Sequence, residues 1–470
     1  MKVAIEGCCH GELDNIYAHI ADLEAKNHYK VDLLLICGDF QAIRNHQDLQ
    51  CMAVPDKYKE IQTFFKYYTG AKRAPIPTIV IGGNHEASNY LWELYHGGWL
   101  APNIYYLGHA GCVQFNGLRI AGASGIFKGY NFSKGFFEKL PYDKEAIRSA
   151  YHIREFNVRK LSLLSSPNIF LSHDWPVGID QYGDYNALIK VKSHFRQEIK
   201  EGRLGSPPLM GLLRALKPEW WFSAHLHCRF EATVVHDNGG IVQPISSQGA
   251  PSMVSAKNPD EIAIEDDFDG EDAKQDPAPL PVQSNNPDEI NLDDEIEDVA
   301  APPAPAPAPP PPSITRFLAL DKCLPKRKFL EVIDIPIEDT FKGPPNELVF
   351  DPEWLAVTRA FQPFFSVHRH QIPFPEEDLA REMVAKELEW VHANILKEEM
   401  MIPVNRVQQF VQTAPGPGSE GNQKFRQRES FEITLLFVQL SIFLTMEAPL
   451  YPNPQTEAYC KLLQIENKIN

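Results

Sequence analysis

The sequence has no uninterrupted apolar run of the ~20 residues that a helix needs to cross a bilayer. Its longest strongly apolar stretch spans residues 433–446 and is broken by Thr434, Gln439, Ser441 and Thr445. Residues 1–6 have the pattern of a strand and lack the charged and apolar regions of a signal peptide. We therefore expect no membrane segment and no secretion signal.

Cysteine is present without a pattern. The eight cysteines show neither a CxxC pair nor the spacing of a disulfide framework. This excludes a disulfide-stabilised secreted scaffold and favours a reducing compartment. Most of the thiols are expected to be buried as small apolar side chains. Cys8 is the exception, because it stands two residues before His10 in a segment discussed below.

The sequence also lacks the excess of positive charge typical of nucleic-acid-binding proteins, since its formal net charge is −17. The charge is unevenly distributed, however. Residues 260–298 hold 16 acidic residues and one lysine, so this stretch carries −15 and the rest of the chain only −2. The remaining chain is close to neutral and can present local basic patches.

An acidic stretch followed by an Ala/Pro-rich stretch separates two parts of the chain with ordinary composition. Residues 257–313 bury too little apolar surface to fold alone, and we predict a disordered insertion. Within it, residues 258–262 recur as 286–290, either as a duplication within a linker or as a short motif read by a partner. The predicted domains are 1–256, completed by two paired strands within 314–337, and a mainly α domain over 338–470.

Short apolar runs alternate with helical patterns over the first part of the chain. Strands are predicted at 31–37, 78–81, 168–171 and 219–222, with helices at 13–23 and 57–68. In the C-terminal part, helices are predicted at 353–361 and 376–396. This alternation indicates a layered α/β fold, in which active sites lie at the carboxyl ends of the strands.

Five short segments place metal-binding residue types directly after such runs: 7–11, 38–40, 83–86, 172–176 and 224–227. Two metals about 3.5–4 Å apart would activate a hydroxide and neutralise phosphate oxygens, and a carboxylate commonly bridges them. We assign the bridge to Asp39. The first ion would be held by Cys8, His10, Asp39 and His227, and the second by Asp39, Asn84, His173 and His225. Imidazole, thiolate and carboxylate together favour zinc or iron over magnesium or calcium.

His85 follows the ligand Asn84 directly and is better suited to protonating a leaving oxygen as a general acid. Glu86 or Asp174 would orient His85 or a ligand histidine. Taken one at a time, each of these residues is more often a turn former, a cap or a solvated side chain. Their joint order after predicted strands favours a two-metal phosphoester hydrolase.

The five segments resemble the calcineurin-like metallophosphoesterase superfamily, with Cys8 in place of its first Asp and Ala224 in place of a Gly. Several stretches are more specifically similar to the RNA lariat debranching enzyme family: 7–11, 38–41, 125–132, 148–154, 172–176, 224–228 and 453–457. The resemblance implies a metallophosphoesterase β-sandwich flanked by helices, a C-terminal debranching-enzyme domain, and hydrolysis of the 2′–5′ phosphodiester at the branch of intron lariat RNA. It further implies Fe²⁺, Zn²⁺ or Mn²⁺ as the two divalent ions, and a nuclear location.

Between Phe127 and Lys160, eight aromatic and eight basic residues are interleaved with four acidic ones. Such a pattern suits splayed nucleotides and their phosphates, although about half of the rings are expected in the core. The resemblance places a lariat-recognition region at about 124–160. The predicted RNA-binding residues are Phe127, Lys128, Tyr130, Phe132, Lys134, Tyr142, Arg148, Tyr151, His152 and Arg154.

The acidic insertion would repel RNA at close range. We hypothesise that it keeps non-specific RNA away or recruits a basic protein partner. Deleting residues 257–312 is then expected to change the salt dependence of activity or the binding of that partner. Unchanged activity, salt dependence and partner binding would contradict both hypotheses.

Two other classes of protein compete with this interpretation. One is a different metallophosphoesterase, such as a repair nuclease or a protein phosphatase; the latter would follow Gly-Asp with Asp-Arg-Gly, whereas here Phe40 and Gln41 follow. The other is a scaffold without activity, which would be expected to have lost ligands. Residues 431–448 fit the family pattern poorly and are either a helix or translated intron sequence, which would be prone to aggregate.

Overall fold

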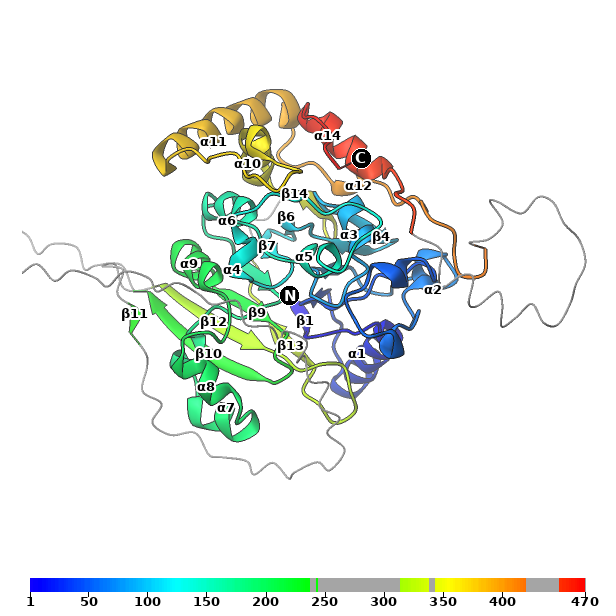
Figure 1. The fold of residues 1–470 in the computed structure, drawn as a ribbon, viewed down its shortest axis with the longest axis vertical. Helices are drawn as coiled ribbons and strands as arrows, with labels where there is room; N and C mark the ends of the chain where they lie inside the picture. Colours follow the sequence, from blue (N-terminus) through cyan, green and yellow to red (C-terminus); the bar gives the residue numbers. More distant parts are fainter. Residues whose placement is uncertain (237–241, 244–312, 338–342, 420–447, 470) are drawn as a thin grey trace, which may run out of the picture. The chain divides into compact units, whose positions relative to one another are not determined.

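The computed structural model describes residues 1–236, 242–243, 313–337, 343–419 and 448–469 (Figure 1). The predicted disordered insertion over 257–312, its internal repeat and residues 431–447 lie outside the described residues. Within the described ranges, none of the helices has the length and apolarity needed to cross a membrane.

The N-terminal strands form a six-stranded sheet. Its order is β13 (Leu330–Asp334), β1 (Lys2–Glu6), β2 (Leu33–Ile36), β3 (Thr78–Val80), β5 (Ile104–Tyr106) and β4 (Gly98–Ala101). β1, β2, β3 and β5 run parallel, and β13 and β4 pair antiparallel at the two edges. Parallel strands end at the same edge of a sheet, so the segments after β1, β2 and β3 meet there.

A second sheet has eight strands. Its order is β11 (Val242–Gln243), β10 (Phe230–His236), β12 (Ser313–Ala319), β9 (Trp220–Ser223), β8 (Ile169–Ser172), β7 (Leu118–Ala123), β6 (Ala110–Phe115) and β14 (Leu348–Phe350). β12, β9, β8 and β7 are parallel. The segments after β8 and β9 therefore also leave the sheet at one edge.

Apolar side chains from both sheets fill one core. Val3 and Ile5 of β1 belong to the same buried cluster as Phe170 of β8 and Phe317 of β12. The intervening Ala4 belongs to a second cluster on the other side of β1, with apolar residues of helix α1 (Leu13–Asn27). This alternation is the two-residue period of a strand with both faces covered. The predicted α/β sandwich flanked by helices is confirmed.

The remaining helices cover the sheets or form the C-terminal part. They are α2 (Phe65–Tyr68), α3 (Ser88–Glu93), α4 (Gly129–Phe132), α5 (Ala146–Ser149), α6 (Glu155–Ser162), α7 (Tyr185–Val191), α8 (Phe195–Lys200), α9 (Pro207–Leu216), α10 (Pro352–Phe361), α11 (Glu377–Val391), α12 (Val404–Val407) and α14 (Pro454–Leu463). The predicted helices near 13–23, 353–361 and 376–396 are present as α1, α10 and α11.

The start of α10 shows how the C-terminal part is attached to the second sheet. Asp351 is the N-cap, and its carboxylate accepts the Trp354 backbone N–H at 3.0 Å before a helix with Pro352 in its first turn. The same carboxylate receives two bonds from the Arg119 guanidinium on β7, at 2.8 and 3.0 Å. β14 lies just before this cap and pairs with β6. The sequence beyond residue 338, predicted as mainly helical, thus contributes a strand to the eight-stranded sheet.

Two predictions about local structure are wrong. The helix predicted over residues 57–68 is limited to the four residues of α2, because the preceding segment is held by tertiary bonds such as that from the Thr63 hydroxyl to the Gly11 carbonyl. The strands predicted within 314–337 exist as β12 and β13, but they do not pair with each other. β12 lies between β10 and β9, whereas β13 pairs with β1 in the other sheet. The turn between them crosses from one sheet to the other.

A buried charge cluster ties the loop after β2 to the C-terminal part. The Arg44 guanidinium is fully buried and bonds the carboxylates of Asp48 and Glu93, with N–O distances of 2.8–3.0 Å. It also donates to the Thr413 hydroxyl at 3.2 Å and lies over the ring of Tyr90. Burial raises the pKa of Glu93 to about 7, against the lowering effect of Arg44. The guanidinium therefore offsets the effect of burial on Glu93.

Arg44→Met is expected to lower the free energy of unfolding by about 3–5 kcal/mol, because it leaves two buried carboxylates without their counter-ion. Chemical denaturation measures this loss. The matched control is Arg381→Met, which removes an exposed pair with Glu377 on α11 and is expected to cost at most about 0.5 kcal/mol. Equal losses in the two variants would contradict a stabilising role for the Arg44 cluster.

Candidate metal centre

All five segments singled out in the sequence follow the ends of strands. Cys8 and His10 follow β1, Asp39 follows β2, and Asn84 follows β3; His173 directly follows β8, and His225 and His227 follow β9. His10, Asp39, His225 and His227 have backbone φ angles of 45°, 47°, 62° and 48°. This left-handed region is unfavourable for side chains with a Cβ, and such strain gathers at functional sites.

Two glycines allow the loops to approach one another. Gly38 has φ +108°, and a Cβ there would overlap the His173 ring. A Cβ on Gly83 would overlap the Asp39 carboxylate. The Gly-Asp and Gly-Asn pairs in the sequence thus reflect close packing between loops as well as turn formation.

The first group of side chains is compact. One potential ligand atom each from Cys8, His10, Asp39 and His227 lies within 4.8 Å of the others. His10 Nε2 lies 3.3 Å from His227 Nε2 and 3.7 Å from Asp39 Oδ2. The Cys8 sulfur is fully buried and accepts the backbone N–H of His225 at 3.1 Å. These four are the residues predicted for the first ion.

The second group lies on the other oxygen of the same carboxylate. Asp39 Oδ1 is 3.4 Å from His173 Nε2, which is itself 3.1 Å from Asn84 Oδ1. His173 Nδ1 lies 2.8 Å from the Cys37 carbonyl, so this nitrogen carries a proton and Nε2 is the ring atom that would bind a metal. The His225 ring is centred 5.0 Å from that of His173. The structure therefore brings together Asn84, His173 and His225, with Asp39 between the two groups.

The chemistry of the donors in the first group fits a bound cation. Asp39 Oδ2 is buried and has no hydrogen-bond partner among the described residues. Burial would raise the pKa of Asp39, but His173, His85 and His10 hold it well below its usual range. Burial lowers the pKa of His10 to about 4 and that of His227 to about 2, so both imidazoles are neutral and can ligate. An anionic carboxylate facing neutral imidazoles and a thiol is a set that metal binding satisfies.

His85 lies at the rim of this cluster. Its ring is centred 5.6 Å from that of His10, and its backbone N–H donates to Asp39 Oδ1 at 2.9 Å. That bond holds the main chain of His85 against the carboxylate between the two groups. The position is compatible with the predicted role as a proton donor to a leaving group.

Glu86 and Asp174 accept backbone N–H groups of the loops around the ligands. Glu86 accepts the N–H groups of Phe40, Gln41 and Gly83 at 2.8–2.9 Å, and so joins the loop of Asp39 to that of Asn84. Asp174 accepts the N–H of Phe127 at 3.2 Å and that of Trp175 at 2.9 Å. Both carboxylates thus hold the loops that carry the ligands, and their role in orienting a histidine stays a prediction.

The aromatic and basic segment that follows β7 begins at this Asp174 contact. Tyr130 is 64% exposed, Arg148 is exposed, and Lys128 and Tyr151 are partly exposed. The rings of Phe127 and Phe132 pack on each other, with centroids 5.5 Å apart. Lys134 donates to Asn131, and Tyr142 is half-buried. As expected, other rings of the segment, including Phe136 and Phe156, belong to the core.

Two residues predicted to bind RNA are wrong for that role, because they are buried. Arg154 is fully buried and bonds Glu138 and the carbonyls of Asn131 and Ser149. His152 is 3% exposed and its Nδ1 lies 3.0 Å from the Asn131 amide nitrogen. Both hold the segment's own turns together. An RNA-binding cation and a buried structural cation give the same sequence pattern beside aromatic residues. The sequence therefore could not distinguish the two roles.

The C-terminal part also holds this segment, which the sequence did not indicate. The backbone N–H of Gly135 donates to Arg369 O at 3.3 Å, and that of Phe136 to Ser366 O at 2.9 Å. The Arg369 guanidinium lies 4.1 Å from the centroid of Phe137 and pairs with Glu145 at 2.9 Å. Residues far apart in sequence thus fix the position of the segment beside the ligand cluster.

Sequence reasoning missed two charged residues near the cluster. Glu6, the last residue of β1, is fully buried; burial and the Asp39 charge raise its pKa well above normal. Neither of its oxygens has a hydrogen-bond partner in the part of the chain that the structure describes. Lys322 lies in the crossing turn beside Cys8. Glu6 could have been singled out from the sequence, because it is a charged residue at the end of an apolar strand. No sequence feature indicated that Lys322 lies near the cluster.

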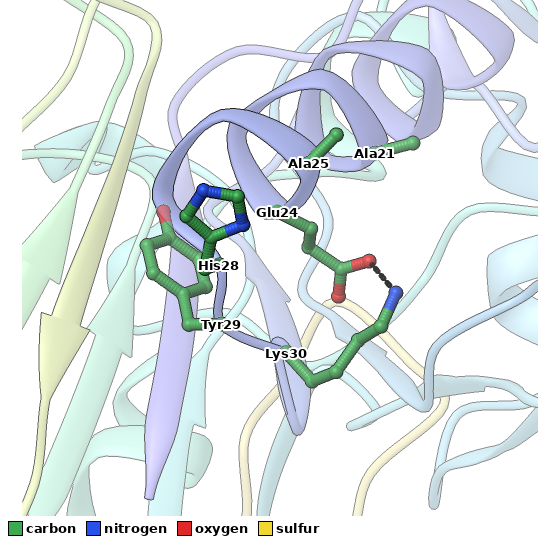
Figure 2. A pocket seen from close by; sticks show the side chains of 6 residues that line it. All are labelled: Ala21, Glu24, Ala25, His28, Tyr29 and Lys30. Atoms are coloured by element: carbon green, nitrogen blue, oxygen red, sulfur yellow. Dashed lines mark hydrogen bonds and ion pairs between the residues drawn. The ribbon is translucent and has the colours of Figure 1, made fainter.

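A surface hollow elsewhere has no relation to this cluster. Figure 2 shows that it is lined by Ala21, Glu24, Ala25, His28, Tyr29 and Lys30, at the C-terminal end of α1. The Lys30 ammonium forms an ion pair with the Glu24 carboxylate at 2.6 Å. α1 begins three residues after His10, so the hollow lies at the opposite end of the helix from the ligands.

Comparisons with known proteins agree with this geometry. Residues 1–229 match the calcineurin-like phosphoesterase family, and residues 312–468 match the family described as lariat debranching enzyme, C-terminal domain. A lariat debranching enzyme of Arabidopsis thaliana is 45% identical over 83% of this chain and 76% of its own length. Those of Drosophila melanogaster and Homo sapiens are 42% and 44% identical, over 100% and 80% of this chain. The matched regions span 78% of the fly protein and 57% of the human one.

Proposed function

Because this chain belongs to the lariat debranching enzyme family, we propose that it hydrolyses the 2′–5′ phosphodiester at the branch point of excised intron lariat RNA. The observation that carries the proposal is the pair of ligand groups that share the Asp39 carboxylate. The names of the relatives supply the substrate. An intron-derived substrate also makes the nucleus the proposed location.

Two divalent cations would be held by the residues already described. Cys8, His10, Asp39 and His227 would bind the first, and Asp39, Asn84, His173 and His225 the second. When bound, such ions neutralise the phosphate oxygens and make a water molecule nucleophilic at neutral pH. The Cys8 thiol has a pKa raised by burial and by Asp39, so it would ligate as a thiolate only with a cation beside it. A thiolate ligand favours the softer iron or zinc. We propose these two ions, together with manganese, which the resemblance to the family adds.

The chain itself would supply the proton that the leaving group needs. His85 would protonate the 2′-oxygen of the branch nucleotide as the ester bond breaks. Its backbone bond to Asp39 fixes it relative to the carboxylate shared by both ions. Glu86 would keep this arrangement by joining the two loops through three backbone N–H bonds.

The exposed part of the 127–151 segment would bind nucleotides next to the branch. The exposed Tyr130 ring would stack on a base, and Lys128 and Arg148 would contact phosphates. Asp174 follows His173 in the chain. Its carboxylate accepts the Phe127 N–H at the start of this segment. The RNA surface and the candidate ligands are therefore joined by one short hydrogen-bonded connection.

Substrate selectivity tests the proposal. Metal-reconstituted protein is presented with a synthetic branched RNA carrying one 2′–5′ linkage, a linear 3′–5′ RNA and a phosphoserine peptide. We expect cleavage of the branched RNA alone. Turnover of the linear RNA or the peptide in its place would assign the chain a different phosphoesterase activity, and no turnover with metal bound would support a scaffold.

A further inference from the structure

The turn that crosses from β12 to β13 passes beside the ligand cluster. Cys8 and Lys322 form an isolated parallel bridge, in which the Cys8 N–H donates to the Asp321 carbonyl at 3.3 Å and the Cys323 N–H to the Cys8 carbonyl at 3.1 Å. Residues opposite each other in a parallel bridge direct their side chains to the same face. Lys322 therefore lies on the same face as the Cys8 sulfur.

The Lys322 ammonium has no ion pair among the described residues, although the side chain is only partly exposed. The bridge to Cys8 sets the lysine beside the first ligand group. A partly buried cation without a carboxylate partner is unfavourable unless an anion approaches it.

Two other cations lie near Lys322. Burial lowers the pKa of Lys322, and the charges of Arg327 and Lys192 lower it further. Arg327 comes from the same turn and pairs with Asp321 at 3.3 Å, whereas Lys192 is the C-cap of α7. Lys192, Lys322, Arg327 and Asp321 together carry a net charge of +2 at neutral pH. We call Lys192, Lys322 and Arg327 the basic rim.

The basic rim is distinct from the 127–151 segment. The rim adjoins Cys8 of the first ligand group through the bridge to Lys322. The 127–151 segment instead joins the second group, through the bond from Phe127 to Asp174 beside His173. In Figure 1, α4 and α5 of that segment are drawn well apart from α7, which ends at Lys192. Each of the two ligand groups is thus linked to a different set of basic residues.

A branched RNA needs more than one such surface, because three strands leave the branch nucleotide. Resting on the function proposed above, we propose that the basic rim, with Lys322 at its centre, binds the backbone phosphates of a second RNA arm. The 127–151 segment would hold the first arm. Lysine suits this task because its compact ammonium contacts phosphates without reading bases, so the rim would position an arm of any sequence.

Three variants of the full-length, metal-reconstituted chain test this inference: Lys322→Ala, Lys322→Arg and Lys328→Ala. The last removes an exposed lysine of the same turn and serves as the control. For branched RNA we expect Lys322→Ala to raise KM about 10-fold or more with little change in kcat, since it removes a charged phosphate contact. The slope of log KM against log salt should fall by about 0.7–0.9. Lys322→Arg should restore most of the affinity, and Lys328→Ala should match the wild type.

Two further substrates separate arm binding from other roles. With bis(p-nitrophenyl) phosphate, which has no RNA arms, Lys322→Ala should behave as the wild type. Branched RNAs in which one arm at a time is shortened to a single nucleotide are also compared. Shortening the arm that the basic rim binds should abolish the KM difference between Lys322→Ala and the wild type. Equal metal content and equal thermal unfolding would show that the site and fold are retained.

The inference is overturned if Lys322→Ala and Lys328→Ala give the same KM and salt slope while the wild type cleaves the branch. It is also overturned if Lys322→Ala loses activity equally on the small phosphodiester, which would place the lysine at the reacting phosphate or in the fold. Failure of the wild type to cleave branched RNA, by contrast, would remove the proposed function on which the inference rests.

Discussion

His85→Ala is expected to reduce cleavage of branched RNA by about 100- to 10,000-fold, the range typical for loss of a general acid. Metal content should be unchanged, because the side chain of His85 is assigned to proton transfer and not to a metal ligand. The main-chain bond from residue 85 to Asp39 survives the substitution, so the loops of Asp39 and Asn84 should keep their positions. Single-turnover kinetics combined with elemental analysis measures both quantities.

His392→Ala is the matched control for His85→Ala, since it removes an exposed imidazole far along the chain after α11. It should leave cleavage and metal content unchanged. A loss of metal in His85→Ala that parallels the loss of activity would show that His85 is a ligand. Unchanged activity in that variant would place the proton donor elsewhere.

Asp39→Asn should have the second large effect, on metal binding itself. The carboxylate faces His10 with one oxygen and His173 with the other, and an amide offers only one neutral oxygen ligand. We expect the bound metal to fall and activity to fall by on the order of 1,000-fold or more, because several kcal/mol of charge stabilisation are lost. Elemental analysis after dialysis and branched-RNA kinetics measure the two effects.

The control for Asp39→Asn is Asp56→Asn, which changes an exposed carboxylate with the same chemistry. This variant should keep both metal and activity. Full metal content in Asp39→Asn would contradict the assignment of Asp39 as the residue shared by the two ligand groups.

The sequence indicated which candidate ligands would lie together, because each of them follows the end of a strand. Asp39 and Asn84 come directly after the parallel strands β2 and β3, and His173 directly after β8. Parallel strands deliver such residues to one edge, so sequence position alone brings them together. Gly38 and Gly83 each precede a predicted ligand at a point of close approach, a packing role that only the structure shows.

The sequence could not predict contacts made across long separations. The tie from Gly135 and Phe136 to the 366–369 segment joins parts of the chain more than 200 residues apart. The Arg154 guanidinium is buried and bonded to Glu138 and to a backbone carbonyl. The aromatic residues near it in the sequence did not indicate this burial. The crossing of β12 and β13 to different sheets likewise depends on β1 and β9 as partners. That crossing, rather than any local pattern, sets Lys322 beside Cys8.

The most direct test of the proposed function identifies the ends produced from a branched RNA with a single 2′–5′ linkage. Apo-protein, and protein supplied with iron, zinc or manganese, are each incubated with this RNA. Our account predicts metal-dependent release of an arm that carries a 5′-phosphate, leaving a free 2′-hydroxyl on the branch nucleotide. Cleavage only at 3′–5′ linkages, or release that leaves the phosphate on the 2′-oxygen, would contradict it.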